Sequence, residues 1–202
     1  MTRWAGVPAG QRRDGRREML VRAGYRLFGD EGEAALTVRA VCREAELHTR
    51  YFYESFADTT ELLGAIYDEQ AAALGATLAE AVETASPDAA ARTRAGVRSV
   101  LQLISDDPRR GRVLFADAPS LGARRRAAEQ SLLDGLVARS GNPRLPTLVA
   151  ATLFTGAMTE LARQWADGRL GSDLDAVVDT AVELALALQT RAARRLREGA
   201  SR

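Results

Sequence analysis

The placement of proline is the feature that most constrains how this chain of 202 residues can fold. None of its six prolines lies between Pro8 and Pro87, and none follows Pro146. Because proline disrupts helix interiors, these two intervals can hold unbroken helices. Both are rich in Ala, Leu, Arg and Glu, which favour helices, and both lack the alternating β-branched runs that are typical of strands. The sequence therefore predicts an all-α protein.

Apolar spacing and capping residues predict where the helices lie. The first covers about residues 15–30, a second runs from an N-cap at Thr37 to Ala45, and a short third covers about 49–55. Asp58-Thr-Thr-Glu61 has the form of a capping box and opens a long helix that ends near residue 85. Further helices are expected near residues 88–105, 108–116, 120–140, 146–167 and 173–197.

Composition excludes several classes of function. With 28 basic and 27 acidic residues the net charge is +1, unlike that of a polybasic coat protein. A single cysteine, Cys42, and a single histidine, His48, provide neither a metal-ligand set nor His-based catalytic machinery, so we expect no metal, no cofactor and no enzyme. No run of about 20 apolar residues is present, and residues 1–10 lack the apolar core of a signal peptide. We therefore expect a cytoplasmic protein without a membrane partner.

The segment 37–56 carries the most informative pattern, two short helices joined by a turn at about residues 46–48. Apolar residues are spaced to pack these helices together and against the first helix: Val38, Val41, Cys42, Leu47, Phe52 and Phe56. The positions left exposed on the second short helix, after His48, are Thr49, Arg50, Tyr51 and Tyr53. Such hydrogen-bonding and stacking side chains suit a helix that enters a DNA major groove. The segment therefore predicts a helix-turn-helix.

Residues 16–68 resemble the DNA-binding domain of TetR-type transcriptional regulators. The resemblance rests on Leu27-Phe28, Gly32, Thr37-Val38, Ala45-Glu46-Leu47, Tyr53, Phe56 and Glu61-Leu62-Leu63. Residues 153–161, continuing to Trp165 and Gly168, are similar to the effector and dimerisation domain of the same family. The resemblance implies a three-helix DNA-binding domain over residues 15–60, after an Arg-rich flexible arm at 1–14. A larger helical ligand-binding and dimerisation domain would cover 61–197, followed by a tail at 198–202.

The resemblance also implies which residues contact DNA: Thr37, Arg39, His48, Thr49, Arg50, Tyr51, Tyr53 and Thr59. The first two would meet a phosphate at the start of their helix. Residues 49–51 would face bases or the adjoining backbone, and Tyr53 and Thr59 would bind phosphates. His48 either contacts DNA or serves only as a cap or an exposed side chain. The arginines of the arm either follow a minor groove or remain solvated.

Three positions depart from the family pattern. Glu46 stands where the turn usually has glycine, and a left-handed backbone there costs a non-glycine residue about 1 kcal/mol. His48 replaces a small N-cap hydroxyl residue, and Thr59 replaces a lysine that often holds a phosphate. The geometry of the turn and the phosphate contacts are therefore left open by the sequence.

For the whole chain, the resemblance implies a ligand-released repressor. A homodimer formed through the last two long helices would bind a near-palindromic double-stranded operator, and a small-molecule effector would release it. Candidate effector contacts, which are also ordinary core positions, are Leu103, Phe115, Phe154, Met158 and Trp165. The last two helices either pair with a second subunit or complete the monomer's core. The alternative function is a helical protein-binding adaptor, or an enzyme, that retains the helix-turn-helix as a scaffold.

Overall fold

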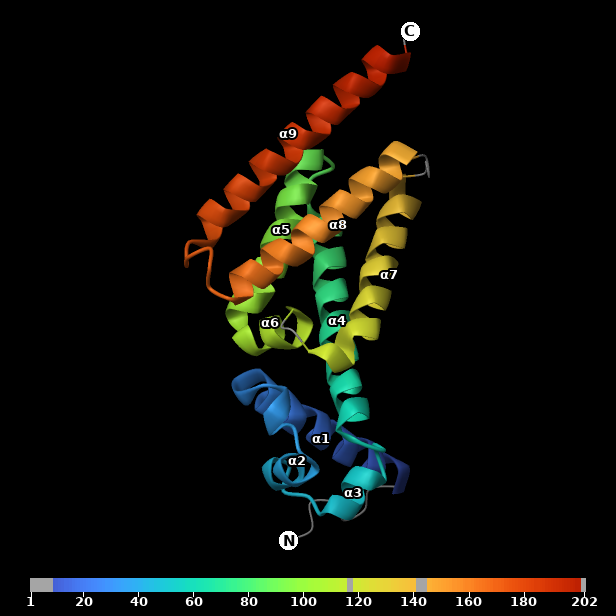
Figure 1. Cartoon of the computed structure of the whole chain (residues 1–202), viewed down its shortest axis with the longest axis vertical. Helices are drawn as coiled ribbons and strands as arrows, with labels where there is room; N and C mark the ends of the chain where they lie inside the picture. Colours follow the sequence, from blue (N-terminus) through green and yellow to red (C-terminus); the bar gives the residue numbers. More distant parts are fainter. Residues whose placement is uncertain (1–8, 116–117, 141–144, 201–202) are drawn as a thin grey trace. The chain divides into compact units, whose positions relative to one another are not determined.

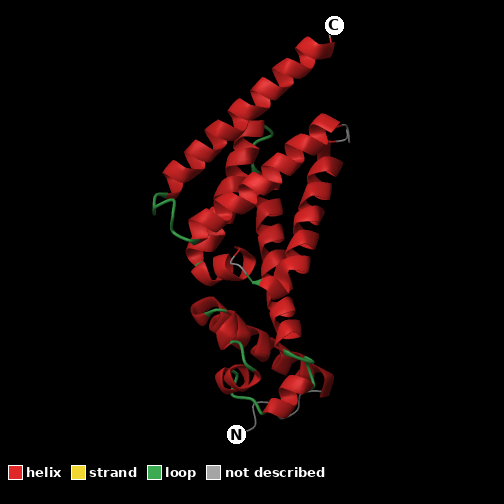
Figure 2. Ribbon diagram, viewed as in Figure 1, coloured by secondary structure: helices red, strands yellow, loops and turns green. Residues whose placement is uncertain are grey.

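All regular structure in the described part of the chain is helical, which confirms the predicted all-α class (Figure 2). The computed structural model describes residues 9–115, 118–140 and 145–200, without the side chains at 136, 139–140, 146–147 and 188–200. In chain order the helices are α1 (Ala9–Glu31), the 3₁₀ turn η1 (Glu33–Ala35), α2 (Val38–Glu44), α3 (Thr49–Tyr53), α4 (Thr59–Thr84), α5 (Ala89–Asp106), α6 (Pro108–Phe115), the 3₁₀ turn η2 (Pro119–Leu121), α7 (Gly122–Ser140), α8 (Leu145–Ala166) and α9 (Leu174–Ala200) (Figure 1).

The chain divides into two compact units. The first consists of Met1–Ala72 and Pro108–Arg125, and the second of Ala73–Asp107 and Arg126–Arg202. Helices α4 and α7 therefore contribute to both units. This division differs from the expected domains, which cover residues 15–60 and 61–197. It differs because α6 packs against α1 and so belongs to the first unit. Where the DNA-binding and effector functions divide remains a prediction.

Large side chains from α1 to α4 fill the core of the first unit. Fully buried are Leu20, Val41, Phe52, Phe56, Leu62, Leu63 and Ile66. The ring centroids of Phe52 and Phe56 lie 5.9 Å apart, which joins α3 to the start of α4. Cys42 is also buried there, and burial raises the pKa of its thiol. The cysteine is therefore a core residue, as its position on the apolar face of its helix predicts.

Helix α1 ends at Glu31 because the next residue, Gly32, takes a positive φ of 86°, which glycine accepts without strain. The amide of Gly32 donates to the carbonyl of Phe28 at 2.9 Å. Carbonyls at a helix end need partners, and Arg112 of α6 supplies one. Its Nη1 donates to the carbonyls of Gly29 at 2.6 Å and of Asp30 at 2.9 Å.

A second arginine of α6 makes the contact with α1 specific. Arg109 Nε donates to Asp30 Oδ1 at 2.7 Å, and this hydrogen bond lowers the pKa of Asp30. The backbone at Gly29 approaches α6 so closely that a Cβ there would lie 2.5 Å from Arg109 Cβ. A glycine at this position is therefore required for α6 to dock on α1.

The second unit is built around α5, which packs against α8 and α9. Its core is the cluster Val97, Leu101, Val178 and Val182, and side chains of α8 pack against it. At the surface, Arg94 pairs with Asp179 and Arg98 pairs with Asp175. These two ion pairs are one helical turn apart on each helix, so they fix the register of α5 on α9.

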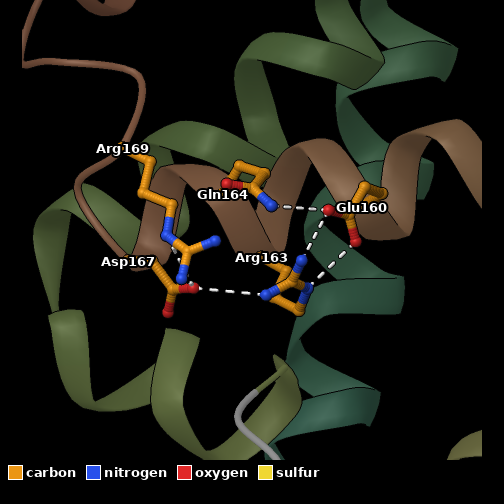
Figure 3. A network of polar contacts seen from close by, with 5 residues as sticks. All are labelled: Glu160, Arg163, Gln164, Asp167 and Arg169. Atoms are coloured by element: carbon orange, nitrogen blue, oxygen red, sulfur yellow. Dashed lines mark hydrogen bonds and ion pairs between the residues drawn. The ribbon is translucent and has the colours of Figure 1, made fainter.

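A polar network closes the C-terminal end of α8 (Figure 3). Arg163 donates to both carboxylate oxygens of Glu160, at 2.5 and 2.9 Å, and Gln164 donates to one of them at 2.6 Å. Arg163 also bonds Asp167 at 3.3 Å, and Asp167 lies 3.9 Å from Arg169 Nε. The hydrogen bonds from Arg163 and Gln164 lower the pKa of Glu160 from its ordinary value of 4.5 to about 2.

Two expectations about the ends of the chain were wrong. Residues 9–14 of the expected flexible arm are part of α1, where Arg13 Nη2 donates to the carbonyl of Glu54 at 2.6 Å and anchors the first turns. Residues 198–200 of the expected tail belong to α9, which the basic residues at 191–197 favour because they lie near its C-terminal end. Residues 1–8 and 201–202 lie outside the described residues.

Candidate nucleic-acid interface

The predicted helix-turn-helix is formed by α2, the turn after it and α3. Thr37 is the N-cap of α2, as predicted, and its Oγ1 accepts a hydrogen bond from the amide of Ala40 at 3.2 Å. The turn closes when the amide of Leu47 donates to the carbonyl of Cys42 at 2.9 Å. Helix α3 begins directly afterwards at Thr49. Local hydrogen bonds therefore set the short connection between the two helices.

Glu46 adopts the left-handed conformation that the family pattern assigns to glycine. Its φ is 54°, the only positive φ of a non-glycine residue in the described ranges. The turn geometry is thus kept, at the cost of about 1 kcal/mol that a side chain incurs there. This answers one question that the sequence left open: the glutamate does not change the conformation of the turn.

Helix α3 separates a buried face from an exposed one. Phe52 is completely buried, whereas the neighbouring Tyr53 is 63% exposed. Their rings meet edge to face, with centroids 5.5 Å apart. A tyrosine that is largely exposed but packs its ring against a buried neighbour can offer its hydroxyl to a phosphate.

Arg50 is exposed on α3, whereas Tyr51, which the sequence predicts to be exposed, is half-buried beside Arg50 and Arg16 of α1. The guanidinium carbons of Arg16 and Arg50 lie 4.5 and 4.8 Å from the ring centroid of Tyr51. Both arginines also reach the carboxylate of Glu54, Arg16 at 3.1 Å and Arg50 at 3.7 Å. Cation–π contacts at these distances place two positive charges against the ring of Tyr51.

The remaining predicted DNA contacts are on the surface of the first unit. Thr37, Arg39, His48 and Thr49 are exposed, and Thr59 is half-buried at the start of α4. The side chain of His48 makes no capping hydrogen bond. Asp58 and Glu61 cap α4 as the sequence predicts: Asp58 Oδ1 accepts from the amide of Glu61 at 2.8 Å, and Glu61 Oε2 accepts from that of Ala57 at 2.6 Å.

Sequence reasoning missed part of this surface. Arg13 and Arg16 fall in or beside the expected arm, and Glu54 is not among the predicted site residues. The spacing of the two arginines on one helical face was a usable signal, because residues three apart are neighbours on a helix. The i,i+4 spacing of Arg50 and Glu54 was a local signal for Glu54, but its other partner, Arg16, is 38 residues away.

The five candidate effector contacts are divided between the two compact units. Phe115 belongs to the first compact unit, whereas Leu103, Phe154, Met158 and Trp165 belong to the second. Met158 and Trp165 pack against the core cluster of that unit. Trp165 Nε1 also donates to Ser105 Oγ at 3.0 Å. Their packing fits the core interpretation, and an effector contact remains a prediction.

No group of three or more His, Cys, Asp or Glu side chains in the part of the chain that the structure describes could hold a metal ion. None of the helices that the structure describes combines the length and apolarity needed to cross a bilayer.

Comparison with known proteins agrees with the site. Residues 20–66 match the family model described as bacterial regulatory proteins of the tetR family. This segment contains α2, α3 and most of the core of the first unit. The family consists of regulators, which agrees with the prediction that this protein is not an enzyme. No protein of curated function matches the chain.

Solved structures share the fold over most of the chain. A putative transcriptional regulator from Pseudomonas aeruginosa PAO1 matches with a TM-score of 0.73 at 17% identity, covering 96% of this chain and 98% of that one. The fatty acid degradation regulator FadR from Bacillus halodurans matches with a TM-score of 0.72 at 16% identity, covering 85% and 94%. A TetR-like regulator from Rhodococcus sp. RHA1 matches with a TM-score of 0.67 at 20% identity, covering 87% and 96%.

At these identities the structural likeness establishes the fold, while the family model adds the identity of the helix-turn-helix segment. Residues 20–66 therefore carry the similarity to the tetR family of bacterial regulatory proteins, and the helical fold of the chain is like that of the solved regulators above.

Proposed function

We propose that this regulator is a ligand-released repressor that binds a near-palindromic operator as a homodimer. The observation that carries the proposal is one face of α3, where exposed Arg50 and Tyr53 and a half-buried Tyr51 surround a buried Phe52. A short helix fixed on a packed core presents these side chains in a defined geometry, as readout of base edges and phosphates requires.

A second copy of the chain supplies the second recognition helix. Helix α8 carries exposed apolar side chains at one-face spacing, Leu145, Leu148, Val149 and Leu153, and α9 adds Leu184. Exposed leucines in such a stripe favour burial against an identical surface. The resulting two-fold dimer would place its recognition helices one turn of DNA apart, about 34–36 Å.

The effector would bind the second unit. Phe154, Met158 and Trp165 are half-buried side chains of α8 and are the candidates for its contacts, together with Leu103 of α5. Between Phe154 and Met158, the Oγ1 of Thr155 is buried without a hydrogen-bond partner among the described residues. A bound molecule could satisfy this hydroxyl. Helix α4 belongs to both units, so it can couple effector and operator, typically by about 1–3 kcal/mol.

The test is selection of binding sites from random DNA duplexes, followed by footprinting at moderate salt. We expect enrichment of a near-palindrome. Tyr53→Ala should weaken binding to every sequence, and Arg50→Ala should also relax the preference at one position per half-site. Arg126→Ala, which removes an exposed arginine of the second unit, should bind like the parent. Absence of any sequence preference in the parent protein would refute the proposal.

A further inference from the structure

Glu54, the residue that follows α3, gathers three arginines around it. Its side-chain carboxylate lies 3.1 Å from Arg16 Nη2 and 3.7 Å from Arg50 Nε. Its backbone carbonyl accepts a hydrogen bond from Arg13 Nη2 at 2.6 Å. Two of the three arginines come from α1 and one from α3, so this acidic group joins both helices next to the proposed DNA-reading face.

The arginines around Glu54 differ in how far their side chains are exposed to solvent. The side chain of Arg16 is only 16% exposed and is fixed between Glu54 and the ring of Tyr51, whereas that of Arg50 is 73% exposed. Glu54 itself is 41% exposed. The carboxylate is therefore open to replacement from the solvent side, and at least one of its partners can turn toward a new anion.

A carboxylate and a phosphate offer arginine the same chemistry, namely two anionic oxygens that accept hydrogen bonds from a planar guanidinium. In the free protein the Glu54 carboxylate thus holds the place that a DNA phosphate could take. When DNA is bound, the negative charge of the Glu54 carboxylate repels the DNA phosphates.

We propose that Glu54 is an internal competitor of DNA. It neutralises Arg16 and Arg50 in the free protein and must release them when the protein binds, so it lowers the affinity for DNA of any sequence. A regulator gains selectivity when its phosphate contacts are weakened, because non-specific binding depends almost entirely on them. This inference rests on the proposed DNA-binding role of α3.

The chain offers a closely matched control. Glu44, at the end of α2, also pairs with an arginine of α1: its Oε1 lies 2.8 Å from Arg26 Nε. Its side chain is 41% exposed, like that of Glu54. Glu44→Gln therefore removes the same charge from a similar ion pair that does not include α3.

The experiment measures binding of the full chain to a random-sequence duplex by fluorescence anisotropy, with the parent, Glu54→Gln and Glu44→Gln, between about 50 and 200 mM salt. Each additional phosphate that a protein neutralises steepens the logarithmic salt dependence by about 0.9. At the lowest salt, we expect Glu54→Gln to bind the duplex at least about threefold more tightly than the parent does. The salt dependence of its affinity should have this steeper slope. Between the lowest and the highest salt, its affinity relative to the parent should therefore fall about threefold. Glu44→Gln should resemble the parent.

Weaker binding by Glu54→Gln, or a slope equal to that of Glu44→Gln, would overturn the proposal, because a merely structural Glu54 changes no phosphate count. Thermal melting checks that the variants fold, and Glu54→Ser repeats the test if Glu54→Gln does not. A separate measurement on the selected operator distinguishes the two proposals. If the parent prefers no DNA sequence, the proposed repressor function is refuted. If the parent has a sequence preference but Glu54→Gln and Glu44→Gln bind alike, only the proposed role of Glu54 is refuted.

Discussion

The two compact units of this chain bury apolar side chains to different extents. In the first unit, aromatic and branched residues such as Phe52, Phe56 and Ile66 are almost completely buried. In the second, the buried cluster is small and valine-rich, and α8 leaves Leu145 and Leu153 largely exposed. The first unit thus satisfies its apolar surface within one chain, whereas the second retains an apolar stripe.

The proposed function accounts for this difference. A recognition helix must be held rigidly, because base readout depends on side chains placed within hydrogen-bonding geometry. A dimerisation surface must instead stay apolar and accessible until a second copy arrives.

The largest effect is expected from removing a central side chain of the first unit. Phe52→Ala should destabilise folding by about 3–5 kcal/mol, because it leaves a cavity in a packed core. The adjacent Tyr53→Ala removes an exposed ring and should change stability by no more than about 0.5 kcal/mol, while weakening DNA binding. Chemical denaturation of both variants measures the contrast. Similar losses of stability would contradict the division of α3 into a core face and a reading face.

A smaller effect is expected for the apolar stripe of the second unit. Leu153 is 68% exposed in the single chain. In a two-fold dimer Leu153→Ala acts twice, and the loss of buried area should weaken dimerisation by about 2–4 kcal/mol, or roughly 30- to 1,000-fold in Kd. Sedimentation at several concentrations measures this. Leu170→Ala, which shortens an exposed leucine outside the stripe, serves as the control. A dimer unaffected by Leu153→Ala would place the interface elsewhere.

The contrast also explains which features were predictable from sequence. The helix-turn-helix depends on local rules: Thr37 as a cap, the pair Asp58 and Glu61, and the alternation of Phe52 with Tyr53. Each of these signals involves residues that are close together in the chain, so it can be recognised from the sequence alone.

Long-range contacts were not predictable in the same way. Arg112 caps the end of α1 from 83 residues away, and Arg16 meets Glu54 across 38 residues. Arginine is also a common solvated residue, so its sequence position does not reveal its partner. The early start of α1 at Ala9 was missed because the Arg- and Gly-rich composition of this stretch suggested a loose arm.

The smallest effect concerns the acid response of the second unit. Because hydrogen bonds from Arg163 and Gln164 lower the pKa of Glu160 from 4.5 to about 2, the folded protein binds this proton at lower pH than the unfolded chain does. The stabilisation is therefore complete above about pH 4.5 and is lost as the pH falls toward 2. Glu160→Gln should melt at a lower temperature than the parent at neutral pH, and the gap should close as the solution is acidified over this range. Since the network lies at the exposed end of α8, the gap should be small. A gap that stays constant between pH 5 and pH 2 would mean that the carboxylate charge contributes nothing to this end of the helix.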